Sequence, residues 1–555
     1  MLYQLSTISK AWLSEDPIQR DFVFDRSPAL SSMLSPIPTR GPLERRINDL
    51  KTFSAKKRQA LAHHLLKQNQ GYGADASAVR AARSLVEPNT YAVLVQLRPA
   101  VLGGRAADFL KVLTAIEWAR RLERDFAIRV VPVLWVLSDH NAAEMLGAWL
   151  VTPADEIRHL SMTPPLPPGC PAPKIQLRPG LDALLGAFDE QMSRSPYGAT
   201  AFDLLKQTGA DSQNLTEWFC RMMARIFSSY GVVVLDGSTP EIRRLTVPLM
   251  KRSLIRQYSI HNELEAGRER LLSAGYHPPV RSRPRETRLY VELGASRRRL
   301  QFDPEREGFF HQGMRSTLDP KGMAEVMAEE HEAFSPDAVL APMVQEAVVP
   351  TLLGVISEGE SGVRAQARTV FGCFEMTPAP VVPQISLTYC PHALLVAIQK
   401  RGLNPSTLLE PLPDVDALMA ARDAHLDQLM ERDLKSRLDE LKGDIARVYH
   451  EGTRELVDEI PSLKPVLDAT ASRFDALLRE VERKAQQHHR RRLPKLTGAY
   501  RRVANHLRPR GYPQERLNMM ALLSHWGMDW LPACHAALRE VVDLRGPFWM
   551  EEFVE

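Results

Sequence analysis

The feature that most constrains the fold is a pair of apolar segments separated by a helical pattern. Tyr91–Leu97 (YAVLVQL) and Val130–Leu137 (VVPVLWVL) are almost continuously apolar, which is typical of strands covered on both faces of a parallel sheet. Between them, apolar residues recur at helical spacing from Phe109 to Leu122. A strand, a helix and a strand in this order predict a right-handed parallel crossover. We therefore expect an α/β core.

Other segments extend this core. The remaining expected strands and a hairpin are Val232–Leu235, Val348–Ile356, Pro380–Leu387, and the pair Arg288–Leu293 and Arg299–Phe302. A helix is expected to begin with Pro240 at its first position, because proline lacks the N–H that a first helical turn leaves unpaired. Residues 1–40 contain Pro and Ser with little periodicity and are expected to wrap over a surface.

Two heptad patterns near the C-terminus predict a helical arm. Their apolar positions are Leu434, Leu438, Leu441, Ile445 and Val448, then Leu467, Ala471, Phe474, Leu478, Val481 and Ala485. Pro461 and Pro465 lie between the two patterns, which favours a helical hairpin, with a homodimer through the arm as the alternative. The expected domains are a core at 1–408 with insertions at about 152–228 and 255–335, the arm at 409–500, and a helical segment at 501–555 that packs back on the core.

Composition excludes several classes of protein. The chain has 555 residues, and its 71 Lys and Arg against 67 Asp and Glu give a net charge of +4. This charge is too small to indicate nucleic acid or an anionic membrane as the main partner. The five cysteines have no metal-ligand spacing, so no metal site is expected, and scattered thiols fit a reducing cytoplasm. We expect a cytoplasmic protein without a signal peptide or membrane span.

Polar residues follow two of the expected strands. Asp139 and His140 come directly after Val130–Leu137, and Asp236 follows the third strand. Open α/β sheets bind ligands at the carboxyl ends of their strands, where such residues bind amines or hydroxyls or act as general acid and base. The alternative is local: Asp139 or Asn141 caps the next helix, His140 is an ordinary polar loop residue, and Asp236 begins a turn with Gly237.

A glycine pair and two carboxylates are further candidates. Gly103 and Gly104 lie between a strand and a helix, where backbone N–H groups can hold a phosphate, with Lys111 two turns further on. The turn lacks the spacing of a dinucleotide or P-loop motif, so the signal is weak. Glu358 and Glu360 place carboxylates in a loop, where they could hold an amine or a metal, although nothing in the sequence supplies the other ligands of a dedicated metal site. The basic runs HHRRR and RSRPRETR lack interleaved aromatic residues and are best explained as solvated surface.

Taken in order, the segments resemble one family along nearly the whole chain, the cysteine-adding enzymes of bacillithiol biosynthesis. YAVLVQLRPAVLGGRAADFLKVLTAI resembles the family pattern TGQQxGLxGGPxYxxxKxxTAI, and RVVPVLWVLSDHNAAE resembles PVFWIxxEDHDxxE. FSPDAVLAPMVQEAVVPTLLGVISEGE is similar to FSPNVLLRPVVQDxLLPTxxYVGGPGE, and HLRPRGYPQERLNMM to PxGxxQERxLN. The resemblance implies a Rossmann-like, nucleotidyltransferase-type core with a C-terminal coiled coil, and the ATP-dependent joining of cysteine to the amino sugar conjugate glucosaminyl malate.

The resemblance also implies site residues. Matched position by position, the candidate catalytic residues are Asp139, His140 and Glu144, and the candidate substrate- or nucleotide-binding residues are Gly103, Gly104, Lys111, Asp236, Gln345, Glu360, Gln366 and Ser386. The chain departs from the family pattern at Val95–Arg98, Ala341, Ile356–Glu358 and Gln384. Two of these changes, at 341 and 384, remove arginines of the kind that hold carboxylates or phosphates bidentately. Arg98 and Arg364 are candidates to replace them.

Three functions follow from this pattern. The first is a divergent cysteine ligase, the second a non-catalytic relative that keeps the fold for binding or dimerisation, and the third a transferase acting on an unrelated amine. A ligase needs positive side chains beside Asp139 and His140 to face a carboxylate or phosphate, whereas a scaffold protein leaves that cavity filled or neutral.

Overall fold

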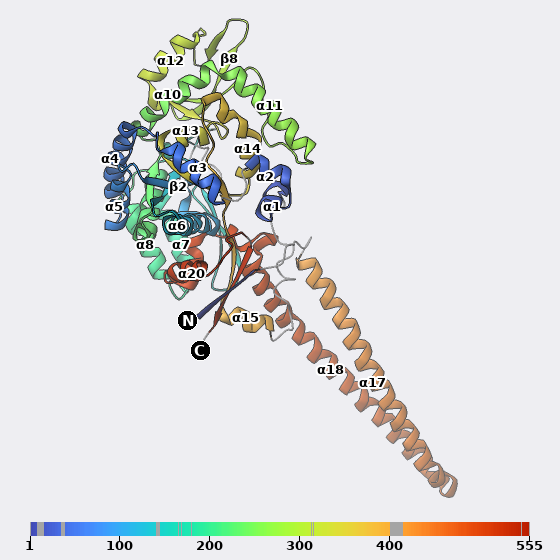
Figure 1. Ribbon diagram of the computed structural model, residues 1–555. Coiled ribbons are helices and arrows are strands. Elements are labelled where there is room, and N and C mark those ends of the chain that lie inside the picture. The colour runs from blue at the N-terminus through green and yellow to red at the C-terminus, as the bar shows by residue number, and fades with distance from the viewer. Residues whose placement is uncertain are drawn as a thin grey trace. The chain divides into compact units, whose positions relative to one another are not determined.

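The computed structural model describes residues 2–7, 16–34, 39–139, 145–164, 166–167, 169–178, 180–311, 313–314, 316–399, 415–545 and 547–553. It divides into two compact units, one formed by Met1–Leu395 with Pro513–Glu555 and the other by Val396–Tyr512 (Figure 1). His140 and Glu144 lie outside the described residues.

The core of the first unit is a five-stranded sheet in the order β12-β11-β2-β3-β6, and all of its neighbouring strands are parallel. In that order the strands are Val381–Pro383, Thr351–Ile356, Thr90–Leu97, Arg129–Val136 and Val233–Asp236. The expected strands at 91–97, 130–137 and 232–235 are therefore confirmed, as is the α/β class with a parallel sheet.

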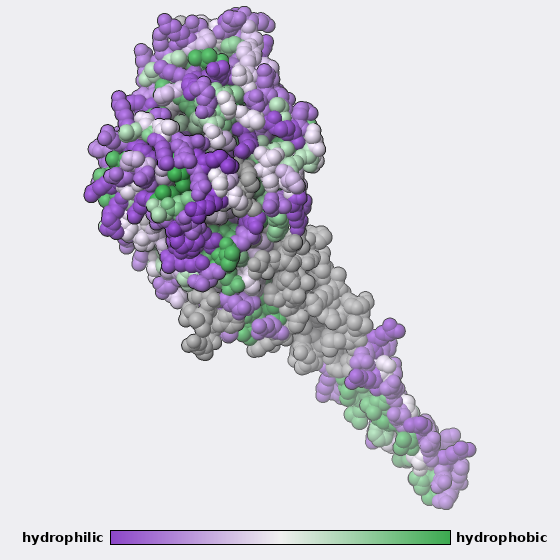
Figure 2. All heavy atoms as spheres, in the orientation of Figure 1, coloured by the Kyte–Doolittle hydropathy of each residue, from purple (hydrophilic) through white to green (hydrophobic). Residues whose placement is uncertain are grey.

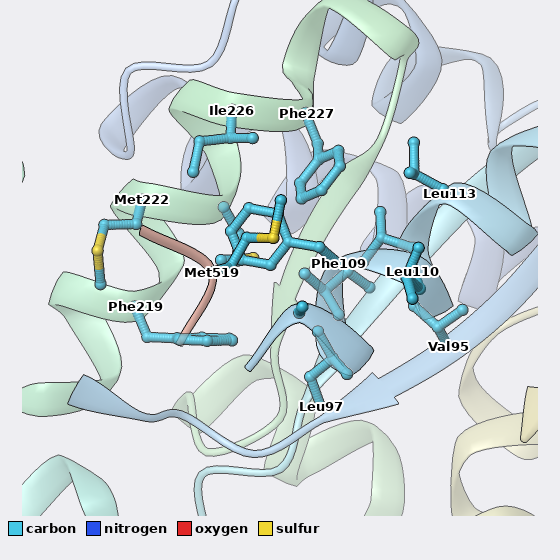
Figure 3. Packing of buried hydrophobic residues seen from close by; sticks show 14 of the residues in the cluster. Val95, Leu97, Phe109, Leu110, Leu113, Phe219, Met222, Ile226, Phe227 and Met519 are labelled. Carbon is cyan, nitrogen blue, oxygen red and sulfur yellow. The ribbon is translucent and has the colours of Figure 1, made fainter. Parts of the chain in front are cut away.

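Both faces of this sheet are covered by helices. Tyr91, Val93 and Val95 of β2 belong to one buried cluster with residues of α6 (Ala106–Phe126) and α9 (Leu215–Phe227). The close-up in Figure 3 shows Val95 and Leu97 beside Phe109 and Leu110 of α6, with Phe219 and Phe227 of α9 nearby. Each large side chain buried in this way contributes about 1.5–3 kcal/mol.

The alternate residues of β2 face the other way. Ala92 and Leu94 share a second buried cluster with residues of α4 (Ala55–Gly71), α5 (Ala76–Ser84) and α10 (Pro240–Ile255). Burial on both faces explains why the strand has almost no polar residue in the sequence.

Two predicted strands were wrong in their bounds. The segment 348–356 is divided, because α13 (Ala341–Val348) continues through Val348 and β11 begins only at Thr351. Pro350 separates them: it lacks an N–H, while its carbonyl accepts a hydrogen bond from Ala92 N (2.9 Å). The segment 380–387 is divided too, since β12 ends at Pro383 and the chain then enters another sheet.

That second sheet joins distant parts of the sequence. Its strands, in the order β1-β14-β13, are Leu2–Thr7, Pro547–Phe553 and Ser386–Cys390. Residues 1–40 therefore contain regular structure that their sequence did not predict: β1 and the helices α1 (Pro17–Val23) and α2 (Pro28–Leu34). The C-terminal segment, predicted to be helical, has helices α19 (Met519–Trp526) and α20 (Trp530–Arg539) but ends in a strand.

Two insertions extend the core. The first contains α7 (Gly180–Met192), α8 (Gly198–Ala210) and α9, preceded by the unpredicted hairpin β4–β5 (Gly147–Val151, Ile157–Ser161). The second contains α11 (Gln257–Ser273), α12 (Pro320–Glu329) and an antiparallel sheet of β10, β7, β8 and β9 (Phe334–Pro336, Glu286–Leu293, Ser296–Asp303, Gly308–Phe310). The expected hairpin at 288–302 is β7–β8 and is confirmed.

The second unit contains the arm, an antiparallel hairpin of two long helices. These are α17 (Val415–Glu459) and α18 (Lys464–Leu507), joined by a short 3-10 turn at Pro461–Leu463 (Figure 1). The hydroxyl of Tyr449 on α17 donates a hydrogen bond to the carbonyl of Leu467 on α18 (2.9 Å). The heptad patterns and the proline break thus predicted this element correctly. Among the helices of the described residues, none is both long and apolar enough to cross a bilayer.

Candidate functional site

Polar side chains form a row along the carboxyl ends of the strands in the central sheet. We call this set the strand-end row: Asp236 and Ser138, Asp139 and Arg243, Gln345 and Gln96, Lys111 and Glu360, Glu358 and Arg516, and Glu515 and Ser386. Six of the eleven predicted site residues belong to it. A row of this kind lies where open α/β sheets bind their ligands.

The row contains an ion pair between Asp139, which follows β3, and Arg243 of α10. The Arg243 side chain is only 2% exposed and also donates to the carbonyl of Phe334, whereas its Nε has no hydrogen-bond partner among the described residues. Asp139, Arg243, Gln345 and other residues line a cavity of about 20 Å³, which is room for about one water molecule. A buried guanidinium with an unused N–H is equipped to hold an anion.

Two further charges surround this pair. Glu292 of β7 lies 3.7 Å from Arg243 Nη2, and burial raises the pKa of its carboxyl, with the charge of Asp139 adding to the effect. Arg297 of β8 donates from Nε to Ser335 Oγ (2.8 Å) and stacks on the ring of Tyr290. Burial lowers the pKa of Arg297, while Asp139 opposes that shift. Two carboxylates and two guanidinium groups therefore gather at the end of β3.

Next along the row, two glutamines connect this cavity to a buried ion pair. Gln345 Nε2 donates to Gln96 Oε1 (3.0 Å), and the backbone carbonyl of Gln96 accepts from Lys111 Nζ (2.9 Å). Lys111 Nζ lies 2.7 Å and 2.8 Å from the two carboxylate oxygens of Glu360, and Glu360 also accepts from the Ser357 N–H. The ammonium group of Lys111 thus donates its hydrogen bonds to other residues of the protein, so Lys111 holds the strand ends in position.

Asp236 lies at the β6 end of the row. One carboxylate oxygen accepts hydrogen bonds from Ser138 Oγ (2.6 Å), Ser238 N (2.9 Å) and Ser238 Oγ (2.8 Å). Burial raises the pKa of Asp236, and these donors partly oppose the rise. Asp236 therefore begins a turn, through its bonds to Ser238, and also joins the ends of two strands, through its bond to Ser138.

The opposite end of the row contains Glu515, which the sequence interpretation did not select. Burial raises the pKa of its carboxyl to about 7, although the neighbouring Ser386 hydroxyl and Leu387 amide act in the other direction. The negative charge of nearby Glu358 adds to the rise, and Arg516, which pairs with Glu358 (3.3 Å), opposes it. A carboxyl with this pKa exchanges a proton near neutral pH.

The glycine turn does not have the form of a phosphate-binding loop. Gly103 and Gly104 are buried with positive φ angles, as expected for a tight turn. However, the N–H groups of residues 104, 105, 106 and 108 all donate to protein acceptors, among them the Asp108 carboxylate. The amide of Asn518 donates to the carbonyls of Leu102 and Gly104 (2.8 Å each). The C-terminal segment thus packs against the turn, and its Met519 lies beside Phe109 in Figure 3.

Gln366 lies away from the row. Its amide accepts from Val280 N (2.9 Å) and donates to the carbonyls of Val280 (2.8 Å) and Leu264 (3.3 Å). Two of these bonds hold Val280 in a loop of the second insertion and the third reaches α11, so Gln366 is in a structural position rather than beside the other candidates.

The positions that depart from the family pattern can also be placed. Ala341 lines the cavity at Asp139 and stands where the family pattern has an arginine. The guanidinium that pairs with Asp139 in the described structure is that of Arg243. Arg364 does not replace the arginine of the family pattern, since its guanidinium lies 3.3 Å from Glu346, which also pairs with Arg46.

Sequence reasoning missed Arg243, Glu292 and Arg297 because α10 and the β7–β8 hairpin meet the strand ends only in three dimensions. For Glu515, the QER triplet within the family-like C-terminal motif was an available signal. No group of metal-ligating side chains occurs among the described residues.

Comparison with known proteins agrees with this architecture. Residues 8–385 match the model described as the N-terminal Rossmann-like domain of bacillithiol biosynthesis BshC, and residues 387–542 match the C-terminal coiled-coil domain of the same family. Proteins named "Putative cysteine ligase BshC" align with most of the chain. One from Bacillus cytotoxicus is 23% identical over 484 residues, which cover 85% of this chain and 87% of the relative. One from Bacillus cereus is 24% identical over 506 residues, which cover 89% and 90%. With both domain models matched in order along nearly its whole length, the chain belongs to the BshC family of bacillithiol biosynthesis.

Proposed function

We propose that this chain is a cysteine ligase that joins the carboxyl group of cysteine to the amine of glucosaminyl malate, with ATP as the activating co-substrate. The names of its relatives support a cysteine ligase. The observation that carries the proposal is the buried Arg243 guanidinium beside Asp139, because a ligase of this kind needs a cation at the strand ends to face the substrate carboxylate.

The charges around this cavity match those of an amino acid. Arg243 and Arg297 offer positive charge for a carboxylate, and Asp139 and Glu292 offer negative charge for an ammonium group. Free cysteine is a zwitterion that carries both groups on one carbon atom. In the proposed complex, the cysteine carboxylate takes the unused Nε of Arg243, and its ammonium group faces the two carboxylates.

The reaction forms one C–N bond and breaks one C–O bond. The amine nitrogen of the sugar attacks the carboxyl carbon of cysteine, one carboxyl oxygen leaves with the group that activated it, and the attacking amine gives up a proton. ATP would supply the activating group. The residues around the glycine turn do not fit its phosphates, because the N–H groups of residues 104, 105, 106 and 108 already donate to protein acceptors, so we assign that turn no part in the reaction. His140 and Glu144, the expected acid–base partners of Asp139, lie outside the described residues.

One observation favours the alternative of a non-catalytic relative. The cavity at Asp139 has a volume of only about 20 Å³, and Arg243 already forms an ion pair with Asp139. Cysteine must therefore displace Asp139 or widen the cavity before it binds. In a non-catalytic relative this ion pair simply closes the site.

The test is direct ligation by the purified full chain. Incubation with ATP, cysteine and glucosaminyl malate should yield the ligated thiol, detected by its mass, and Arg243→Gln should abolish it. Arg288→Gln is a matched control, because Arg288 is also a buried arginine paired with an aspartate, Asp337 (3.3 Å). Absence of both product and ATP consumption in the wild type would overturn the ligase proposal. Equal losses in the two variants would show that the Arg243 effect reflects folding.

We also propose a homodimer through the arm. The hairpin buries Leu438 and Leu478 but leaves a stripe of apolar residues exposed: Leu441, Val448, Leu456, Val466, Phe474, Leu477 and Val481. Figure 2 shows such green, apolar residues on the arm surface among hydrophilic ones. Helices with heptad spacing bury stripes of this kind against other helices, and a second copy of the arm offers the same stripe.

A further inference from the structure

A groove in the second insertion lies outside the strand-end row. It has a volume of about 430 Å³ and is lined by one face of α11 and by the loop that follows it; we call it the α11 groove. Its lining residues are Glu265, Arg268, Leu272, His277, Pro278, Val280, Arg281, Ser282 and Arg283. None of them lines the cavity at Asp139, and its volume falls in the range of about 300–1,000 Å³ typical of small-molecule sites.

The loop wall of the groove is fixed in place. Gln366 binds both the N–H (2.9 Å) and the carbonyl (2.8 Å) of Val280. Two residues further on, Ser282 Oγ accepts from Arg288 Nη2 (2.7 Å) and lies 2.8 Å from His261 Nδ1. Because the loop is held through the backbone of Val280 and the side chain of Ser282, on both sides of residue 281, the side chains of Arg281 and Arg283 start from defined positions. Fixing the loop in advance lowers the entropy that a ligand must overcome.

The groove carries an excess of positive charge. Arg281 and Arg283 form no ion pair among the described residues, and Arg268, which pairs with Glu269, and His277 lie on the same lining. Glu265 is the only carboxylate among the lining residues. This differs from the buried arginines nearby, such as Arg288, whose charge is balanced by an aspartate. Unbalanced guanidinium groups in a groove attract an anion and bind phosphate through paired hydrogen bonds.

Apart from Ser282, the rest of the lining is apolar. Leu272, Pro278 and Val280 face the same groove as the arginines. Inorganic phosphate alone would leave much of this volume and all of this apolar surface unused. We propose that the α11 groove is a second ligand site, which binds the phosphate group of a small molecule through Arg281 and Arg283 and its apolar part against Leu272 and Pro278. The basic run RSRPRETR then has a local binding role.

This site is tested by isothermal titration of the full chain with phenyl phosphate, which combines a phosphate with an apolar ring. We expect phenyl phosphate to bind more tightly than inorganic phosphate, and Leu272→Ser to reduce that difference. Arg281→Ser with Arg283→Ser should weaken phenyl phosphate binding by about tenfold or more, because the variant loses both charge-assisted hydrogen-bond donors to the phosphate.

The matched control is Arg80→Ser with Arg83→Ser, which removes the same charge from exposed positions on α5. Equal affinity in the two double variants would overturn the proposal, as would absence of phenyl phosphate binding to the wild type. Binding of a single-stranded oligonucleotide that depends on Arg281 and Arg283, without phenyl phosphate binding, would assign the groove to nucleic acid and also overturn it. The titration contains neither ATP nor cysteine, so its outcome is separate from that of the ligation assay.

Discussion

Lys111 Nζ lies 2.7 Å from Glu360 Oε1, and the lysine side chain is only 2% exposed. This ion pair joins the helix that follows β2 to the first turn of α14 (Glu360–Ala367), which follows β11. The lysine also donates to the carbonyl of Gln96 on β2. Lys111 thus connects the ends of two neighbouring strands, β2 and β11, and holds this part of the strand-end row in position.

Lys111→Met should destabilise the first unit strongly. It leaves the Glu360 carboxylate without its main partner in a largely buried position, for which the expected cost is about 3 kcal/mol. Urea unfolding followed by circular dichroism measures this loss. The double variant Lys111→Met with Glu360→Gln removes both charges and should recover most of it. A double variant as unstable as the single one would show that the lysine acts through packing and not through the ion pair.

The sequence predicted the parts of the fold that depend on local patterns. The apolar runs of β2 and β3 and the heptads of α17 and α18 were found because burial on both faces and helix pairing each leave a periodic signal. β1 and β14 were missed because they are stabilised by each other, Leu2 pairing with Phe553 at opposite ends of the chain. The same reason applies to the site: Asp139 follows a strand that the sequence predicted, but its partner Arg243 lies on α10, where no local pattern marks this arginine as part of the site.

Arg243→Lys separates charge from geometry at the proposed cysteine site. Lysine keeps the positive charge but lacks the planar fork and the unused Nε–H. We expect the KM for cysteine to rise by about tenfold or more, with a smaller change in the KM for glucosaminyl malate. Steady-state ligation kinetics with each substrate varied in turn measures both values. Arg288→Lys is the control, and a similar KM change in that variant would contradict a specific role for Arg243.

Glu515→Gln should change how stability depends on pH. Burial raises the pKa of the Glu515 carboxyl to about 7 from 4.5, so the folded state holds a proton that the unfolded state has lost between these values. The stability from this group is fully present below pH 4.5 and decreases as pH rises to about 7. The wild type should therefore lose up to about 3 kcal/mol relative to Glu515→Gln between pH 5 and pH 8. Urea unfolding of both proteins across this range measures the difference, and parallel curves would contradict the raised pKa.

Asn518→Ala should destabilise the turn at Gly103 and Gly104, and it changes no charged group. The Asn518 amide donates to the carbonyls of Leu102 and Gly104, and its oxygen accepts from Ala521 N (3.1 Å). Removing it leaves two buried carbonyls and one helix N–H with fewer partners, at a cost of about 2–3 kcal/mol. Chemical unfolding measures the loss. Asn48→Ala is a control on an exposed helix position, and an equal effect there would show that the turn contributes nothing specific.

Charges placed on the exposed stripe of the arm should separate the proposed homodimer. Val448 is 66% exposed and Val466 is 62% exposed, so Val448→Glu with Val466→Glu costs the hairpin little but would bury uncompensated charge between two arms. We expect the wild type to sediment as a dimer and this variant as a monomer, with unchanged helix content. Ser436→Glu with Ser472→Glu adds the same charge at exposed polar positions of the same two helices and should remain dimeric. A monomeric wild type, or a stripe variant that still sediments as a dimer, would remove the arm stripe as the dimer interface.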